Sequence, residues 1–92
     1  GGLPGMLSFV SVAAPYELSA CKRAEDRAGL IVRAVNMSDR PATLTITTAP
    51  VLRIRSAWRT DLCERRQAGV PVRAGRVTVR GRPWEIITVE LV

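Results

Sequence analysis

The chain has 92 residues, a formal net charge of +6 and no histidine, and 47% of its residues are hydrophobic against 24% charged. This length fits one small domain and excludes an independent (β/α)8 barrel or dinucleotide-binding fold, which need ~200 residues or more. The missing histidine excludes a Ser-His-Asp or Cys-His catalytic centre and any zinc site with histidine ligands.

Short strands are expected throughout the chain. Apolar and polar residues frequently alternate, and no segment keeps a helical spacing of apolar residues over three turns. The alternation predicts strands, in chain order, at residues 7–13, 16–23, 29–36, 42–48, 52–59, 76–80 and 84–92. With turn signals between them, about seven or eight short strands predict an all-β fold, a small antiparallel β-sandwich.

The alternation also predicts which side chains face the interior. In 16–23 it places Tyr16, Leu18 and Ala20 on one face and Cys21 on the other. The segment 29–36 is apolar on both faces, which is typical of a central strand, and Arg33 interrupts it.

Later strands are less regular. In 52–59, Trp58 shares the apolar face and three arginines share the other, and 61–69 is expected to be a polar corner. In 76–80 two valines point inward and two arginines outward. The last strand, 84–92, needs either a bulge near Ile86 or burial on both faces.

Three ordered stretches carry a family resemblance. The first is SFV (8–10) leading to LSACKRAED (18–26) and GLIVRAVN (29–36), the second is residues 57–64, which end in DLCE (61–64), and the third is PWEIITVEL (83–91). Together they resemble the C-terminal domain of glycoside hydrolase family 38, the α-mannosidase family. The resemblance implies that residues 1–92 are a single C-terminal accessory β-sandwich domain, a fragment of a longer glycosidase.

This resemblance also implies that catalysis takes place in another part of the parent enzyme. The parent enzyme would hydrolyse α-mannosides with a zinc ion and a carboxylate nucleophile, both in an N-terminal barrel. We therefore expect no catalytic, cofactor-binding or metal-ligating residue and no cofactor in this chain. Its expected partners are the other domains of the same polypeptide, which it would pack on and stabilise. Some self-association of the isolated chain is also expected, because its docking face would then be exposed.

Arg33 is the first candidate site residue. A buried arginine needs a partner, because an unpaired buried charge costs several kcal/mol. Glu64 and Glu85 lie in the resemblance stretches and are the candidate partners for a structural ion pair. Exposure of Arg33 on an outer face and contact with a ligand are the alternatives.

A second set of candidates is basic. If the strands 52–59 and 76–80 are neighbours, five outward arginines form one cationic face that could dock on other domains: Arg53, Arg55, Arg59, Arg76 and Arg80. An ordinary solvated face is the alternative. A nucleic-acid interface is disfavoured, since the chain has only four aromatic residues and no stacking platform between the arginines.

Two further pairs of residues have both a functional and a structural interpretation. Trp58 and Trp84 could stack on sugar rings in a carbohydrate-binding module, but core packing is favoured for both. Cys21 and Cys63 are expected to be buried free thiols rather than one disulfide, and they supply at most half a zinc site. With free thiols, no visible signal peptide and no membrane span, a cytoplasmic location is expected.

Overall fold

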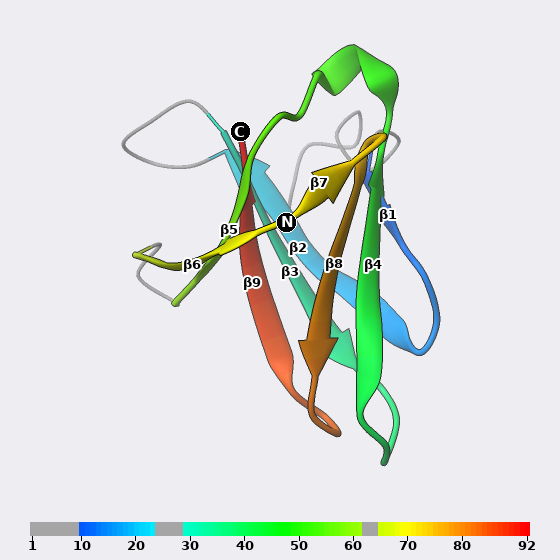
Figure 1. The fold of residues 1–92 in the computed structure, drawn as a ribbon. Helices are drawn as coiled ribbons and strands as arrows, with labels where there is room; N and C mark the ends of the chain where they lie inside the picture. Colours follow the sequence, from blue (N-terminus) through cyan, green and yellow to red (C-terminus); the bar gives the residue numbers. More distant parts are fainter. Residues whose placement is uncertain (1–9, 24–28, 62–64) are drawn as a thin grey trace.

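The structure is a computed structural model of the chain, and it describes residues 10–23, 29–61 and 65–92. Within these ranges nine strands form two antiparallel sheets that pack face to face (Figure 1). The predicted all-β antiparallel sandwich is confirmed.

The two sheets contain four and five strands. The four-stranded sheet has the order β1 (Val10–Val12), β4 (Ala42–Thr48), β8 (Arg76–Gly81) and β7 (Val72–Arg73). The five-stranded sheet has the order β2 (Tyr16–Arg23), β3 (Leu30–Asn36), β9 (Ile86–Leu91), β5 (Ala57–Thr60) and β6 (Arg66–Val70). The exposed strand β6 is therefore one edge of the larger sheet, and its pairing with β5 shifts register between Arg59 and Thr60.

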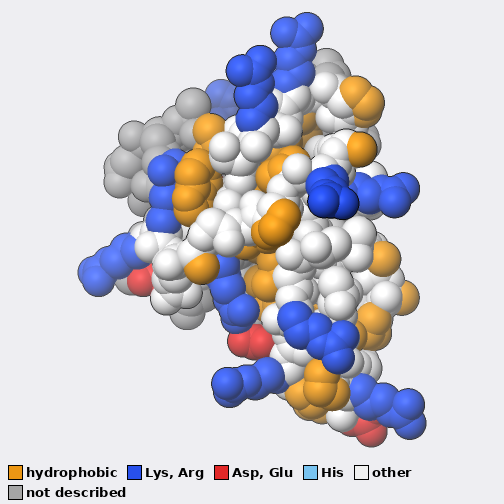
Figure 2. Space-filling view, viewed as in Figure 1, with side chains coloured by type: hydrophobic (Ala, Val, Ile, Leu, Met, Phe, Trp, Pro, Cys, Tyr) orange, Lys and Arg blue, Asp and Glu red, His pale blue; other side chains and the backbone are white. Residues whose placement is uncertain are grey.

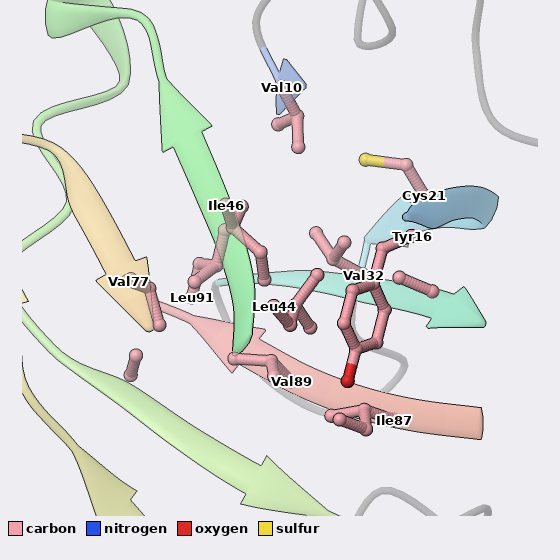
Figure 3. Packing of buried hydrophobic residues seen from close by; sticks show 12 residues of the cluster. Val10, Tyr16, Cys21, Val32, Leu44, Ile46, Val77, Ile87, Val89 and Leu91 are labelled. Carbon is pink, nitrogen blue, oxygen red and sulfur yellow. The ribbon is translucent and has the colours of Figure 1, made fainter. Parts of the chain in front are cut away.

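The core lies between the inner faces of the sheets (Figure 3). Leu44 and Ile46 from β4 are fully buried, and so are Val32 from β3 and Ile87 and Val89 from β9. Because side chains alternate along a strand, one face of each of these strands supplies the core. Strand β9 is buried along residues 87–91 on both faces, as one of the two predicted alternatives required.

The face assignment within β2 was wrong at its centre. The pairing of β2 with β3 shifts between Leu18 and Ala20, so the alternation reverses there. Cys21 consequently pairs with inward-facing Val32 and is fully buried, whereas Ala20 pairs with Arg33 on the outer face. A bulge of this kind inserts one residue and leaves no clear mark in the alternation.

The predicted strand 52–59 was wrong over its first half. Pro50–Leu52 forms a short 3-10 helix, and residues 53–56 follow without regular secondary structure. Arg55 and Ser56 instead donate their backbone N–H groups to the Val92 carbonyl, at 2.9 and 3.0 Å. The predicted polar corner 61–69 was also wrong in part, because residues 66–70 pair with β5 as strand β6.

Tyr16 joins the two sheets. Its side chain is buried, and its hydroxyl donates a hydrogen bond of 3.0 Å to the Ala42 carbonyl at the start of β4. The ring passes over Gly81, where a Cβ atom would collide with the Tyr16 hydroxyl and lie 2.8 Å from Ile87 Cδ1. Glycine is thus required at position 81 by a side chain from the opposite sheet.

Asn36 holds two turns together at one end of the sandwich. Its fully buried amide donates hydrogen bonds of 2.9 Å to the carbonyls of Arg40 and Arg82, which lie in different turns. Its Oδ1 accepts hydrogen bonds from the Ser38 backbone N–H at 3.1 Å and the Ser38 hydroxyl at 2.8 Å. Both donors and the acceptor of this amide are therefore satisfied inside the protein.

The substitution Gly81→Ala is expected to lower the free energy of unfolding by about 1–3 kcal/mol, because the new methyl group overpacks the contact with Tyr16 and Ile87. Urea denaturation followed by circular dichroism measures this change. Gly69→Ala is the matched control, since a Cβ at Gly69 meets no atom within 4 Å. Equal effects of the two substitutions would contradict the packing described here.

The substitution Asn36→Asp is expected to cost about 2–4 kcal/mol, because two buried carbonyls lose their donor and face a carboxylate instead. Ser38→Ala removes a single hydroxyl from the same turn and is expected to cost only about 1 kcal/mol. Thermal and urea unfolding of the two variants compare these costs. If Asn36→Asp lowers the free energy of unfolding no more than Ser38→Ala does, the hydrogen bonds from Asn36 to the two turns contribute little to stability.

Candidate functional site

The five arginines proposed as a docking surface come from strands of both sheets and from a connection, not from two neighbouring strands. Arg76 and Arg80 are exposed on β8, where alternation directs them to the outer face of the four-stranded sheet. Arg59 lies on β5, whose neighbours are β9 and β6 in the other sheet. Figure 2 shows basic side chains spread over the visible face among neutral ones. The single cationic face required β5 and β8 to be neighbours, and they are not.

Arg53 and Arg55 lie in the connection between the 3-10 helix and β5. Arg53 has a left-handed backbone, with φ of 50°, where the short helix ends. Both side chains are exposed. Their role in docking stays a prediction, but they would act from a connection rather than from a strand face.

Arg59 instead pairs with Glu85. Arg59 Nη2 lies 2.6 Å from Glu85 Oε2, and Glu85 Oε1 accepts a 2.8 Å hydrogen bond from the Arg82 backbone N–H. The Arg82 N–H bond and the Arg59 guanidinium together lower the pKa of the Glu85 carboxyl against the opposing effect of burial. Burial, chiefly, raises the pKa of the Tyr16 hydroxyl, which also feels the charges of Glu85, Arg59 and Arg80.

A second ion pair lies on the outer face of the five-stranded sheet. Glu90 has no exposed surface, and its Oε1 accepts a 2.6 Å bond from Arg66 Nε. The Arg66 guanidinium lies 3.8 Å from the centroid of the Trp58 ring, and Trp58 pairs directly with Glu90 across β5 and β9. Trp58 is thus part of an arginine–carboxylate cluster on an outer face, and its predicted place in the core was wrong.

Arg33 projects from the same outer face but without these contacts. Its cross-strand partner on β9 is Thr88, which in turn pairs with Thr60 on β5. Arg33 Nε and Thr60 Oγ1 are both buried and make no hydrogen bond. The pair Arg33–Glu85 does not form, since Glu85 binds Arg59 at the end of the sandwich. Glu64, the other predicted partner, lies outside the described residues.

Trp84 is the most exposed large hydrophobic residue of the described chain. The residue is 57% exposed, compared with 56% for Ile86 and 47% for the turn residue Met37. Its backbone is left-handed, with φ of 59°, and its N–H donates to the Ser38 carbonyl at 3.3 Å. The predicted core position of Trp84 was therefore wrong. Trp84 lies in the turn before β9, whereas Glu90, the partner of Trp58, lies near the far end of that strand.

Among the described residues no side-chain group fits a metal centre. The chain has no histidine, and within the three described ranges no three cysteine or acidic side chains lie close enough to hold an ion. Cys21 is a free, buried thiol, and burial raises its pKa, which disfavours the reactive thiolate. Cys63 lies outside the described residues. In the part of the chain that is described, no helix is long and apolar enough to cross a membrane.

The pair Arg59–Glu85 predicts a pH dependence of stability. Because the folded-state pKa of Glu85 is lowered, its stabilising effect is present above the unfolded-state value near 4.5 and is lost as the pH falls through the lower folded-state value. Glu85→Gln is expected to reduce the free energy of unfolding by roughly 1 kcal/mol at pH 7. The difference from wild type should shrink toward zero in strong acid.

Urea unfolding at a series of pH values tests this expectation. Glu17→Gln, which removes an exposed carboxylate on β2, is the matched control and should change little at any pH. A constant difference between wild type and Glu85→Gln across the acid range would refute the proposed origin of the pH dependence.

Comparison with known proteins places the chain in a family. Residues 16–89 match the family model described as the glycosyl hydrolases family 38 C-terminal beta sandwich domain. Searches of curated proteins and of solved structures gave no significant match. The matched region runs from the first residue of β2 to within β9 and includes strands of both sheets, while β1 precedes it. The chain therefore belongs to the family of glycosyl hydrolase family 38 C-terminal β-sandwich domains.

Proposed function

We propose that this chain is a non-catalytic accessory domain of an α-mannosidase-like glycoside hydrolase, which packs on the catalytic part and stabilises it or its oligomer. The family match over residues 16–89 carries this proposal. In this scheme the paired carboxylates for glycoside hydrolysis, and the zinc ion, belong to the catalytic part.

The surface of the domain supports a packing role. Met37, Trp84 and Ile86 each expose about half of their apolar side chains near the end of the sandwich that Asn36 holds together. Exposed apolar side chains that gather in one region of a small protein mark a site of contact with another surface. Since the two turns are fixed by buried hydrogen bonds, these side chains are presented on a rigid support.

The direct test is reconstitution. The 92-residue chain and the separately produced remainder of its glycosidase polypeptide are mixed and analysed by gel filtration and thermal unfolding. We expect a 1:1 complex and a higher unfolding temperature for the catalytic part, because binding to the folded state stabilises it. Without the remainder, the chain should not hydrolyse an aryl α-mannoside in the presence of zinc. Failure to form a complex, or turnover by the chain alone, would overturn the proposal.

Exposure of Trp84 favours carbohydrate binding as a second candidate function. An exposed indole can stack on a sugar ring, whereas Trp58 is already covered by the Arg66 guanidinium. Titration of the chain with mannose oligosaccharides, followed by tryptophan fluorescence, separates the two functions. Saturable quenching that Trp84→Ala abolishes would support the binding-module function, and unchanged fluorescence would exclude it.

A further inference from the structure

Three residues form a row across the outer face of the five-stranded sheet. Arg33 on β3 pairs with Thr88 on β9, and Thr88 pairs with Thr60 on β5. We call these three residues the Arg33 row. Arg33 and Thr60 are two strands apart, or about 10 Å between backbones, a distance that the long arginine side chain can largely cover.

The Arg33 row holds the two buried side-chain polar atoms that make no hydrogen bond in the described part of the chain, Arg33 Nε and Thr60 Oγ1. Thr60 is only 5% exposed. A buried polar atom without a partner is destabilising. In Arg33 this applies to Nε, since the residue as a whole is half-buried. Two such groups in one row of the same face, with only Thr88 between them, indicate that the surface is incomplete without a partner.

The neighbouring residues that the structure describes do not supply these partners. In the adjacent row, Glu90 is bound by Arg66, and Trp58 lies under the Arg66 guanidinium. On the other side, Ile86 pairs with Val35 and is 56% exposed. The Arg33 row therefore lies between a cluster whose carboxylate is already engaged and an exposed apolar strip.

The hydrogen-bond donors of the Arg33 row favour a negatively charged acceptor. Arg33 Nε is an obligatory donor on a group that stays protonated, and the Thr60 hydroxyl can also donate. A carboxylate accepts several hydrogen bonds at once and matches the fork of donors on a guanidinium. The apolar strip of Val35 and Ile86 would accept an apolar side chain next to that carboxylate.

We propose that the Arg33 row is the docking site for an aspartate or glutamate side chain of the catalytic part of the same polypeptide, with an adjacent apolar residue packing on Val35 and Ile86. This inference rests on the proposed accessory function and identifies the face that makes the contact. Arg33 is then an interface residue whose counter-charge is supplied by another domain.

The test compares variants in the reconstitution assay, with affinity measured by calorimetry. Arg33→Met is expected to weaken binding about 30-fold or more, because it leaves the partner carboxylate without its counter-charge. Thr60→Val should weaken binding by about 5-fold through loss of one hydrogen bond. Arg76→Met, on the exposed outer face of the other sheet, is the matched control and should stay within about 2-fold of wild type.

The unfolding temperature of the chain alone separates an interface role from a structural one. Arg33→Met and Thr60→Val each remove a buried group without a partner, so the unfolding temperature should stay level or rise, by roughly 4 °C where the change is favourable. A structural arginine would give a lower unfolding temperature instead. A clear fall for both variants would overturn the inference.

The outcomes of the two proposals are distinguishable. If the wild-type chain forms no complex with the catalytic part, the accessory function fails and the inference fails with it. If the wild-type chain binds and Arg33→Met binds equally well, the accessory function stands and the Arg33 row is not the docking site. Weaker binding by Arg33→Met at an unchanged or higher unfolding temperature supports the inference.

Discussion

A buried hydrogen-bonding group must find a partner, and this requirement organises the small sandwich. The apolar core fills the middle, but buried polar groups fix the ends. Asn36 joins two turns through its amide, and the Thr48 hydroxyl donates a 3.0 Å hydrogen bond to the Gly75 carbonyl in the turn between β7 and β8. Among the described residues the Arg33 row is where this requirement is not met, and the docking proposal starts from that observation.

The fold class could be predicted from the sequence because apolar and polar residues alternate along several strands. Residues 42–48 form β4 with the predicted bounds because alternate residues are buried, and 16–23 form β2 with the predicted bounds although a register shift interrupts the alternation. The strand β6 was missed because it is an exposed edge whose residues carry no apolar pattern. The first half of 52–59 failed for a tertiary reason, since Arg55 and Ser56 bond the Val92 carbonyl 36 or more residues away.

The candidate site was harder to predict than the fold. Arg33 is conspicuous in the sequence because it interrupts an apolar strand, yet its neighbours Thr88 and Thr60 follow only from the cross-strand register. The pairing of Glu90 with Arg66 depends on the same register and on the β5–β6 pairing. Trp84 was misplaced because its orientation is set by a left-handed turn, which alternation cannot reveal.

Strand β6 is an edge strand of the five-stranded sheet. Backbone groups along an open sheet edge can recruit a strand from another molecule and so begin aggregation. Here the register shift between Arg59 and Thr60 breaks the regular ladder beside β6, and the strand begins with Arg66, a charged residue engaged with Glu90. A charged residue and an irregular ladder are two features that disfavour pairing of a sheet edge with a strand from another molecule, and β6 has both.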